Sequence, residues 1–311
     1  MAALREGTAE QQAFLAALVE QELLIESGVP GVYGRGADFE AVRAGVDALV
    51  TRAAVGDGAE PLRFPPVLPR RQLEETGYLK SFPHLAGSIF AFEGSESQAR
   101  ELHETASRHE DWSSHVEQSE LVLTPAACYP VYPAIARRGP LAPAGVTVDT
   151  GGAYVFRHEP STDPARLQMF HMRELVRIAE PETVAAWRDA WRDRAVALLR
   201  SLGLAAEFDV AADPFFGRGG RMMAASQRQQ ALKFEILVAI AGPEPTAIAS
   251  FNYHQDHFSA THGIVMQDGS AAHTACLGFG LERVTLALLA QHGLELGGWP
   301  ESVRGDLRLP G

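Results

Sequence analysis

Cysteine is scarce in this sequence. The 311 residues include only Cys128 and Cys276, too few for a framework of disulfides. Because the two lie far apart along the chain, spacing alone leaves three interpretations open: one bridge, two thiols that hold a metal, or two buried thiols. A chain of this length can bury a sizeable hydrophobic core, so it needs no cross-links to fold.

Long apolar runs are also missing. No stretch approaches the roughly eighteen consecutive apolar residues of a membrane-spanning helix. The first 24 residues mix Glu, Gln and Arg into their apolar positions, whereas a signal peptide has a basic start followed by a purely apolar run. We therefore expect no membrane partner and a cytoplasmic location.

Positive charge, and lysine above all, is in short supply. Lys80 and Lys233 are the only lysines, and 27 Lys and Arg stand against 39 Asp and Glu, which gives a net charge of −12. Proteins that bind nucleic acids through phosphates rely on clustered Lys and Arg. The composition therefore disfavours such a partner, although a local arginine patch is compatible with an acidic chain.

The hydrophobic pattern predicts an α+β protein. Strand-like segments follow one another from about residue 120 with few helices between them, which favours an antiparallel sheet over a doubly wound parallel one. Residues 56–71 are rich in Pro, Gly and Arg and are expected to form an extended connector. Helices are expected at 8–26, 38–54, 97–116 and 182–204, the last ended by Gly203 as a C-cap glycine.

A hairpin pattern at 155–174 carries side chains suited to a nucleotide. VFRHEP and RLQMFHMRE are typical of two strands joined by a turn of about six residues rich in Ser, Thr, Asp and Pro. Alternation puts Arg157 and Glu159 on one face of the first strand, and Arg166 and Phe170 on one face of the second. These side chains suit a triphosphate and a stacked base. Ordinary ion pairs on a solvated hairpin are the alternative.

A second pattern lies in CLGFGLERVTLALL at 276–289. Gly278 and Gly280 sit where an extended segment opens a helix, and glycines let a backbone approach a ligand closely. Arg283, in the first turn, can reach a phosphate. Taken alone, the pattern equally fits a tight strand-to-helix turn beside an exposed arginine.

Together the two patterns resemble the second and third motifs of the class II aminoacyl-tRNA synthetases, in the same order and at a similar separation. VFRHE is similar to the family's Phe-Arg-x-Glu, and GFGLERVTLALL closely matches its glycine-rich third motif. Arg166, Phe170 and Glu174 stand at the arginine, phenylalanine and glutamate of the seryl-type returning strand. The resemblance covers roughly 115–290 and implies an antiparallel sheet flanked by helices.

The resemblance also implies roles in ATP binding. Arg157 and Arg283 would hold and polarise the phosphates, Glu159 would bind the adenine amino group, and Phe170 would stack on the ring, with Arg166 beside them. Seryl cores carry a magnesium-binding glutamate shortly before a Ser-x-Asn element, but this chain reads TAIASFN there. Glu235 is our candidate for the missing magnesium ligand.

A zinc site follows from the same resemblance. Where the seryl core has a substrate-contacting Thr-x-Glu loop, this chain has TPAAC, which places Cys128 near the substrate pocket. Glu174 ends the second motif and Cys276 opens the third, so the fold would bring all three together. Two thiolates and a carboxylate would hold Zn²⁺ and leave its fourth position for the substrate amine. A methanogenic type of seryl-tRNA synthetase uses such a site, and the chain resembles its truncated bacterial relatives, the amino acid:[carrier protein] ligases, more closely still.

The expected unit is the whole chain, 1–311, with a catalytic core at 116–311. The portion 1–115 contains GVPGVYGRG and FPPVLPRR, which break any long coiled coil of the kind that grips tRNA. We therefore expect no tRNA partner. The resemblance implies instead that a small amino acid (glycine, alanine or serine) passes to the phosphopantetheine thiol of an acidic carrier protein. Such a carrier needs a local arginine patch on this acidic chain, and the candidates are the arginines at 217–221 with Arg228, or those at 136–138. It also implies a homodimer.

Three other functions remain open at this stage. A reduced aminoacyl-tRNA synthetase would use the same motifs, and total tRNA would then accept the amino acid. A non-catalytic synthetase paralogue usually loses its motif arginines, whereas this chain keeps Arg157 and Arg283. A ligase that forms amides with small-molecule amines would also make an adenylate.

Overall fold

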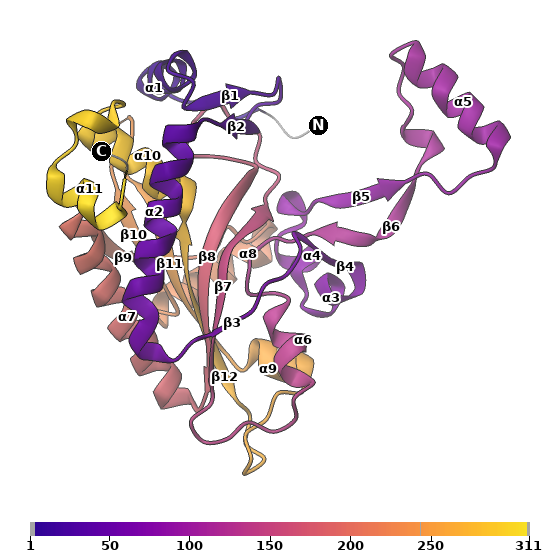
Figure 1. Ribbon diagram of the computed structural model, residues 1–311. Coiled ribbons are helices and arrows are strands. Elements are labelled where there is room, and N and C mark those ends of the chain that lie inside the picture. The colour runs from indigo at the N-terminus through magenta and orange to yellow at the C-terminus, as the bar shows by residue number, and fades with distance from the viewer. Residues whose placement is uncertain (1–3, 243, 310–311) are drawn as a thin grey trace.

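A seven-stranded sheet forms the centre of the computed structural model, which describes residues 4–242 and 244–309 (Figure 1). All neighbouring strands pair antiparallel except the short edge strand β3, which runs parallel to β7. The α+β class and the antiparallel sheet expected from sequence are thus confirmed. In spatial order the strands are β3 (Glu60–Pro61), β7 (Val146–Phe156), β8 (Met169–Ala179), β12 (His273–Gly280), β11 (Thr246–Gln255), β10 (Lys233–Val238) and β9 (Glu207–Val210).

Long helices cover one face of this sheet and build the main core. These are α2 (Ala37–Ala54), α7 (Pro181–Ser201), α10 (Leu281–His292) and the short α11 (Glu301–Leu307) (Figure 1). Helix α7 buries Val184, Trp191 and Leu199 at helical spacing, which is why it packs by one side. Gly203 follows it at φ 82°, so the C-cap glycine is confirmed.

Smaller elements cover the other face. Next to the sheet lie α6 (Val131–Ala136), α8 (Gly217–Gln229) and α9 (His257–His262). A three-stranded sheet in the order β4 (Val67–Pro69), β6 (Glu117–Leu123), β5 (Ser88–Ala91) carries α3 (Arg70–Glu75) and α4 (Tyr78–Ser81) beside it. Helix α5 (Glu96–Ser107) projects from the far end of β5 and β6, away from the body (Figure 1).

The remaining elements are short or lie near the N-terminus. They are α1 (Ala9–Glu20), β1 (Leu24–Glu26), β2 (Tyr33–Arg35) and the 3-10 turns η1 (Val55–Asp57), η2 (Pro83–Leu85), η3 (Ser113–His115) and η4 (Leu296–Gly298). No helix in the described part of the chain has both the length and the apolar character needed to cross a bilayer.

Two expected helices end early because the backbone turns left-handed after them. Helix α1 stops at Glu20, Glu22 follows at φ 54°, and the chain then enters β1. Helix α5 stops at Ser107, with His109 at φ 56°. Such conformations end a right-handed helix. The segment after residue 123, expected as strand, instead turns into the helix α6.

Candidate functional site

A cavity of about 400 Å³ opens on the face of the sheet opposite α7. Its floor is formed by β8, β12, β11 and β10, and its walls by the loop after β6, by α4 and by α8. Aromatic rings make up much of the wall: Tyr78, Phe82, Tyr129, Phe215 and Phe258. The polar groups that converge on it include Cys128, Arg157, Glu174, Lys233, Asn252 and Cys276.

The strand register brings polar residues from distant parts of the sequence side by side. Glu174 of β8 lies opposite Gly278 of β12, and Cys276 lies opposite Asn252 of β11, which faces Lys233 of β10. A Cβ atom at Gly278 would lie 3.2 Å from Cγ of Glu174. The glycine of the third motif therefore leaves room for the glutamate of the second.

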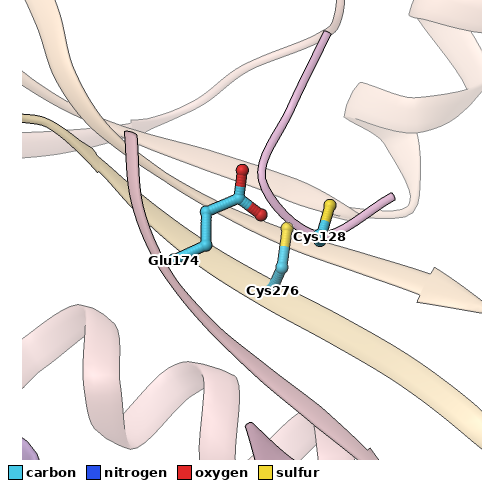
Figure 2. A group of neighbouring side chains, drawn as sticks. All are labelled: Cys128, Glu174 and Cys276. Carbon is cyan, nitrogen blue, oxygen red and sulfur yellow. The ribbon is translucent and has the colours of Figure 1, made fainter. Parts of the chain in front are cut away.

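The three predicted zinc ligands lie together (Figure 2). Cys128 comes from the loop between β6 and α6, and the other two residues come from neighbouring strands. Their ligand atoms all lie within 4.8 Å of one another, and Cys128, Glu174 and Cys276 are all buried. The backbone N–H of Ala127 donates to Oε1 of Glu174 at 2.9 Å, which ties the loop to the sheet.

This donor set fits a zinc ion. Oε2 of Glu174 is buried without a hydrogen-bond partner among the described residues, an arrangement that is costly unless a further group binds the oxygen. Two nitrogen atoms lie near the Cys276 sulfur: Nδ2 of Asn252, which donates to it at 3.7 Å, and Nε2 of His254 at 3.6 Å. Two thiol sulfurs and a carboxylate oxygen facing a cavity match a catalytic zinc site with one open position.

Without a cation, an ionised Cys276 opposes the ionisation of Cys128 and Glu174. Burial, followed by the charge of Cys276, raises the pKa of Glu174. A hydrogen bond to Cys276 and burial raise the pKa of Cys128. The pKa of Cys276 is lowered, first by the hydrogen bond from Cys128 and then by His254 and Asn252. A bound dication would remove this conflict.

The predicted ATP residues gather at the β7–β8 connection, but the hairpin is more open than expected. Its strands end at Phe156 and resume at Met169, so Arg157 and Glu159 lie in a loop and not on one strand face. Pro160 in this loop has no N–H for a ladder, and the chain pairs instead with the N-terminal segment, where Arg5 N donates to Pro160 O at 3.0 Å.

Within this loop the predicted side chains approach one another. The Arg157 guanidinium carbon lies 6.0 Å from the Phe170 ring centroid, and Arg166 Nη1 lies 3.8 Å from Glu159 Oε1. Phe170 is buried on the same face of β8 as Glu174, as strand alternation requires for residues four positions apart. These placements agree with an ATP site, and the individual roles stay predictions.

Arg283 is anchored by backbone carbonyls in the first turn of α10. Its Nε donates to Ala165 O at 2.7 Å and its Nη1 to Ala247 O at 2.9 Å. Burial, helped by the charges of Arg157 and Arg166, lowers the pKa of Arg283 to about 10, so it stays cationic at neutral pH. Three guanidinium groups close enough to repel one another suggest a site for a polyanion.

A buried lysine and its partner were not recognised as site residues in the sequence. Lys233 Nζ lies 2.6 Å from Asp213 Oδ1 and 2.9 Å from Glu235 Oε1. Asp213 in turn binds the Gln227 side chain of α8. The carboxylate of Glu235 is thus engaged by an ammonium group, and its role as a magnesium ligand stays a prediction. One signal was available in the sequence: Lys233 is one of only two lysines and stands within a strand-like segment. A lysine that a strand buries almost always has an acidic partner, so the sequence indicated that such a partner exists without naming it.

Comparison with known proteins places this architecture. No family model matches the chain. It is 47% identical over 292 residues to the "Amino acid--[acyl-carrier-protein] ligase 1" of Bradyrhizobium diazoefficiens, which covers 93% of this chain and 88% of that protein. It is 48% identical over 291 residues to ligase 2 of the same organism, covering 92% of this chain and 86% of the relative.

Among solved structures, the chain resembles the seryl-tRNA synthetase of M. kandleri, determined in complex with A. aeolicus tRNASec. The TM-score is 0.81 at 22% identity, over 99% of this chain and 61% of that one. This likeness shows the class II synthetase fold, as expected from the motifs. The identity and coverage of the two curated relatives show more: the chain belongs to the amino acid--[acyl-carrier-protein] ligases.

Proposed function

We propose that this protein activates an amino acid with ATP and transfers it to the phosphopantetheine thiol of a carrier protein. In the first step a carboxylate oxygen of the amino acid attacks the α-phosphorus of ATP, and pyrophosphate leaves. In the second step the thiolate attacks the carbonyl carbon of the aminoacyl adenylate, and AMP leaves. The observation that carries the proposal is the close relation to two named ligases along nearly the whole chain.

The arginines of the site would stabilise the charge that develops in the first step. Arg157 lines the cavity, and Arg283 and Arg166 are near enough for their charges to interact with one another. Cationic groups fixed where phosphate charge grows need no rearrangement during the reaction. Phe170 beside Arg157 supports the proposal that the adenine ring stacks there, with Glu159 accepting from its amino group.

Cys128, Glu174 and Cys276 would hold a zinc ion at the cavity wall. When bound, the ion would supply a Lewis-acidic position that accepts an uncharged amine and so selects an amino acid over a plain carboxylic acid. The donor groups support this proposal because the unpartnered Glu174 oxygen and the two sulfurs lie together.

A small uncharged amino acid (glycine, alanine or serine) suits the cavity best. Of the charged groups that line it, Asp213 and Lys233 already bind each other, and Arg157 is assigned to phosphate. Among the Asp, Glu, Lys and Arg side chains of the described lining, none is therefore left as an unpaired partner for an acidic or basic side chain, apart from the proposed metal ligands.

Of the two arginine patches, the one on helix α8 is the better candidate for docking an acidic carrier protein. Arg218, Arg221 and Arg228 are exposed, and the described residues provide none of them with an ion pair. The same helix supplies Met223, Ser226 and Gln227 to the cavity wall, so a partner docked on it would stand at the entrance. At the other patch, Arg138 is already neutralised by Glu60 at 2.6 Å.

Two assays test the function. Pyrophosphate exchange into ATP, run with each of the twenty amino acids, should respond to one or a few small ones. Radiolabelled amino acid, ATP and enzyme should then label holo carrier protein from the same genome as a thioester that hydroxylamine releases. Apo carrier should stay unlabelled. Labelling of tRNA instead, or equal labelling of apo and holo carrier, would contradict the proposal.

A further inference from the structure

Glu282 is a fully buried carboxylate beside the proposed phosphate-binding Arg283. Only 1% of its surface is exposed, and it stands in the first turn of α10. A buried carboxylate is tolerated only when hydrogen bonds or an opposite charge compensate it. Glu282 has both kinds of compensation, and its partners come from parts of the chain far from the third motif.

The first partner is His171 of β8. Its backbone N–H donates to Glu282 Oε2 at 2.8 Å, and its Nδ1 lies 2.7 Å from Glu282 Oε1. His171 directly follows Phe170, and alternation sends the two side chains to opposite faces of the sheet. The carboxylate therefore clamps the backbone of the strand that carries the proposed adenine-stacking ring to the helix that carries Arg283.

The second partner is Arg35 of β2, in the N-terminal portion of the chain. Its Nη1 donates to Glu282 Oε1 at 2.9 Å, and only 12% of its side chain is exposed. The same guanidinium binds Glu40 and the Tyr154 hydroxyl, and it lies 5.4 Å from the Tyr154 ring centroid. The Tyr154 ring, in turn, lies 3.8 Å from the His171 ring.

These contacts form one connected network around the Glu282 carboxylate. Through it, Arg35 of the N-terminal hairpin is connected to β7, β8 and α10. None of its members lines the cavity. Charge-assisted hydrogen bonds of this kind are stronger than neutral ones and fix geometry. A site that must hold two ends of one nucleotide gains most from such a link, because a small displacement between its parts weakens binding.

We infer that Arg35, Glu282 and His171 are positioning residues for the ATP site: they set the distance between Phe170 and Arg283 from behind the sheet. The inference rests on the proposed function. It also assigns the hairpin at residues 24–35, which lies outside the core expected from sequence, a part in nucleotide binding.

The test compares ATP with the amino acid. Arg35→Met and Glu282→Gln should each raise the KM for ATP at least about tenfold, while the KM for the amino acid changes less than about threefold. Gln keeps the volume of Glu282, but its amide NH₂ must face either the backbone N–H of His171 or the guanidinium N–H of Arg35, and so breaks one of these two hydrogen bonds. If Arg35 acts through Glu282, the double variant should be no worse than Glu282→Gln alone.

Asp57→Asn is the matched control. Asp57 is another poorly exposed carboxylate on the same side of the sheet, where it accepts from Trp191 Nε1 and pairs with Arg194 at 3.3 Å, and neither partner is a proposed nucleotide residue. It should lower thermal stability without a selective effect on ATP. If Asp57→Asn raises the KM for ATP as much as Arg35→Met, or if Arg35→Met leaves that KM unchanged, the inference is overturned.

Two further features keep the outcomes separable. Should Glu282→Gln fail to fold, Arg35→Met and Tyr154→Phe at the more exposed end carry the test with the same expected ATP-selective effect. Failure of the wild-type chain to exchange pyrophosphate with any amino acid would count against the proposed function itself. Direct titration with ATP alone would then still show whether Arg35→Met weakens nucleotide binding by about tenfold.

Discussion

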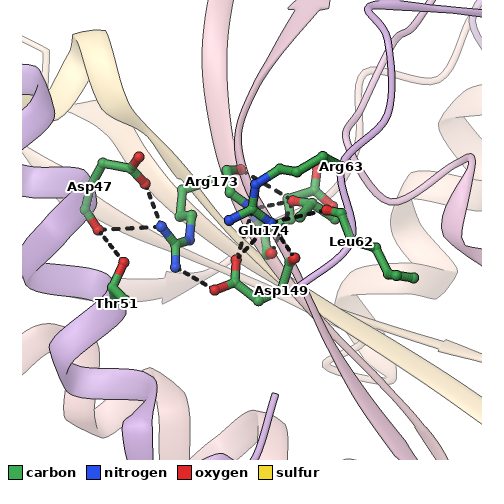
Figure 3. A network of polar contacts seen from close by, with 9 residues as sticks. Asp47, Thr51, Leu62, Arg63, Asp149, Arg173 and Glu174 are labelled. Carbon is green, nitrogen blue, oxygen red and sulfur yellow. Dashed lines mark hydrogen bonds and ion pairs between the residues drawn. The ribbon is translucent and has the colours of Figure 1, made fainter. Parts of the chain in front are cut away.

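Arg173 and Glu174 are consecutive residues of β8, and their side chains point to opposite faces of the sheet. Glu174 points to the two cysteines, while Arg173 binds Asp47 of α2 at 2.5 Å and Asp149 of β7 at 2.6 Å (Figure 3). The Thr150 hydroxyl donates to the Glu174 carbonyl at 3.0 Å across an irregularity in the β7–β8 ladder. The backbone of the proposed metal ligand is thus held from behind by a charged network.

This network predicts a large loss of stability for Arg173→Met. The change leaves Asp149 with little compensation in a poorly exposed position, and breaking a buried pair in this way commonly costs about 3 kcal/mol or more. Urea unfolding would measure the loss. Arg63→Met is the control, because Arg63 meets the same Asp149 but is 59% exposed and should matter by less than about 1 kcal/mol. Equal losses for both variants would contradict the account.

The zinc proposal predicts about one zinc per chain in protein purified without chelators. Cys128→Ala and Cys276→Ala should each abolish metal binding by elemental analysis, because two ligands bind zinc far more weakly than three. Ser250→Ala is the control. Ser250 lines the cavity on the same sheet face but is not a member of the ligand group, so that variant should keep its metal. Wild-type protein that contains no metal after such a purification would contradict the zinc proposal.

Arg283→Ala should lower the kcat of pyrophosphate exchange by about a hundredfold or more, since losing a fixed cation from a developing phosphate charge costs several kcal/mol. Zinc content should not change. Arg200→Ala offers a comparison, because its Nε also donates to a backbone carbonyl, that of Ala206 at 2.9 Å, remote from the cavity. A loss below about threefold in Arg283→Ala would show that the residue only anchors the start of the helix.

Class II cores are expected to pair, and we predict a homodimer for this chain. Light scattering at micromolar concentration should give twice the 33.6 kDa of one chain. The resemblance to class II cores implies that part of the region before Cys128 forms the interface. A mass of one chain under these conditions would contradict the prediction.

Much of the site could be predicted from sequence because its signals are local. The alternation of β8 separates Phe170 and Glu174 from Arg173, and the glycines of the third motif mark the turn into α10. Cys128 needed more than local pattern. Its place depended on the likeness of TPAAC to a known loop, since nothing in the spacing of two cysteines shows that they meet.

Other features were hidden for physical reasons. The contact between Arg35 and Glu282 joins residues 247 positions apart, and neither periodicity nor composition records such a pairing. The ion pair between Lys233 and Asp213 is likewise a tertiary contact that the sequence pattern does not record, and Gln227 of α8 completes it by donating to Asp213. Helices α1 and α5 end where a single residue adopts a positive φ. No residue type at those positions requires that conformation, so the sequence does not locate the two helix ends.

The carrier proposal gives the last prediction. Changing Arg218, Arg221 and Arg228 on α8 to Glu should slow labelling of a holo carrier protein by tenfold or more, because three reversed charges would repel an acidic partner and lower its association rate. Pyrophosphate exchange should stay within about twofold, since the three side chains are exposed and do not line the cavity. The defect should shrink when salt is raised, as screened charges repel less. Arg137→Glu, an exposed arginine of the alternative patch, should label the carrier normally. If Arg137→Glu is impaired and the α8 variant is not, the carrier docks at residues 136–138. If both label normally, charge on neither patch recruits the carrier.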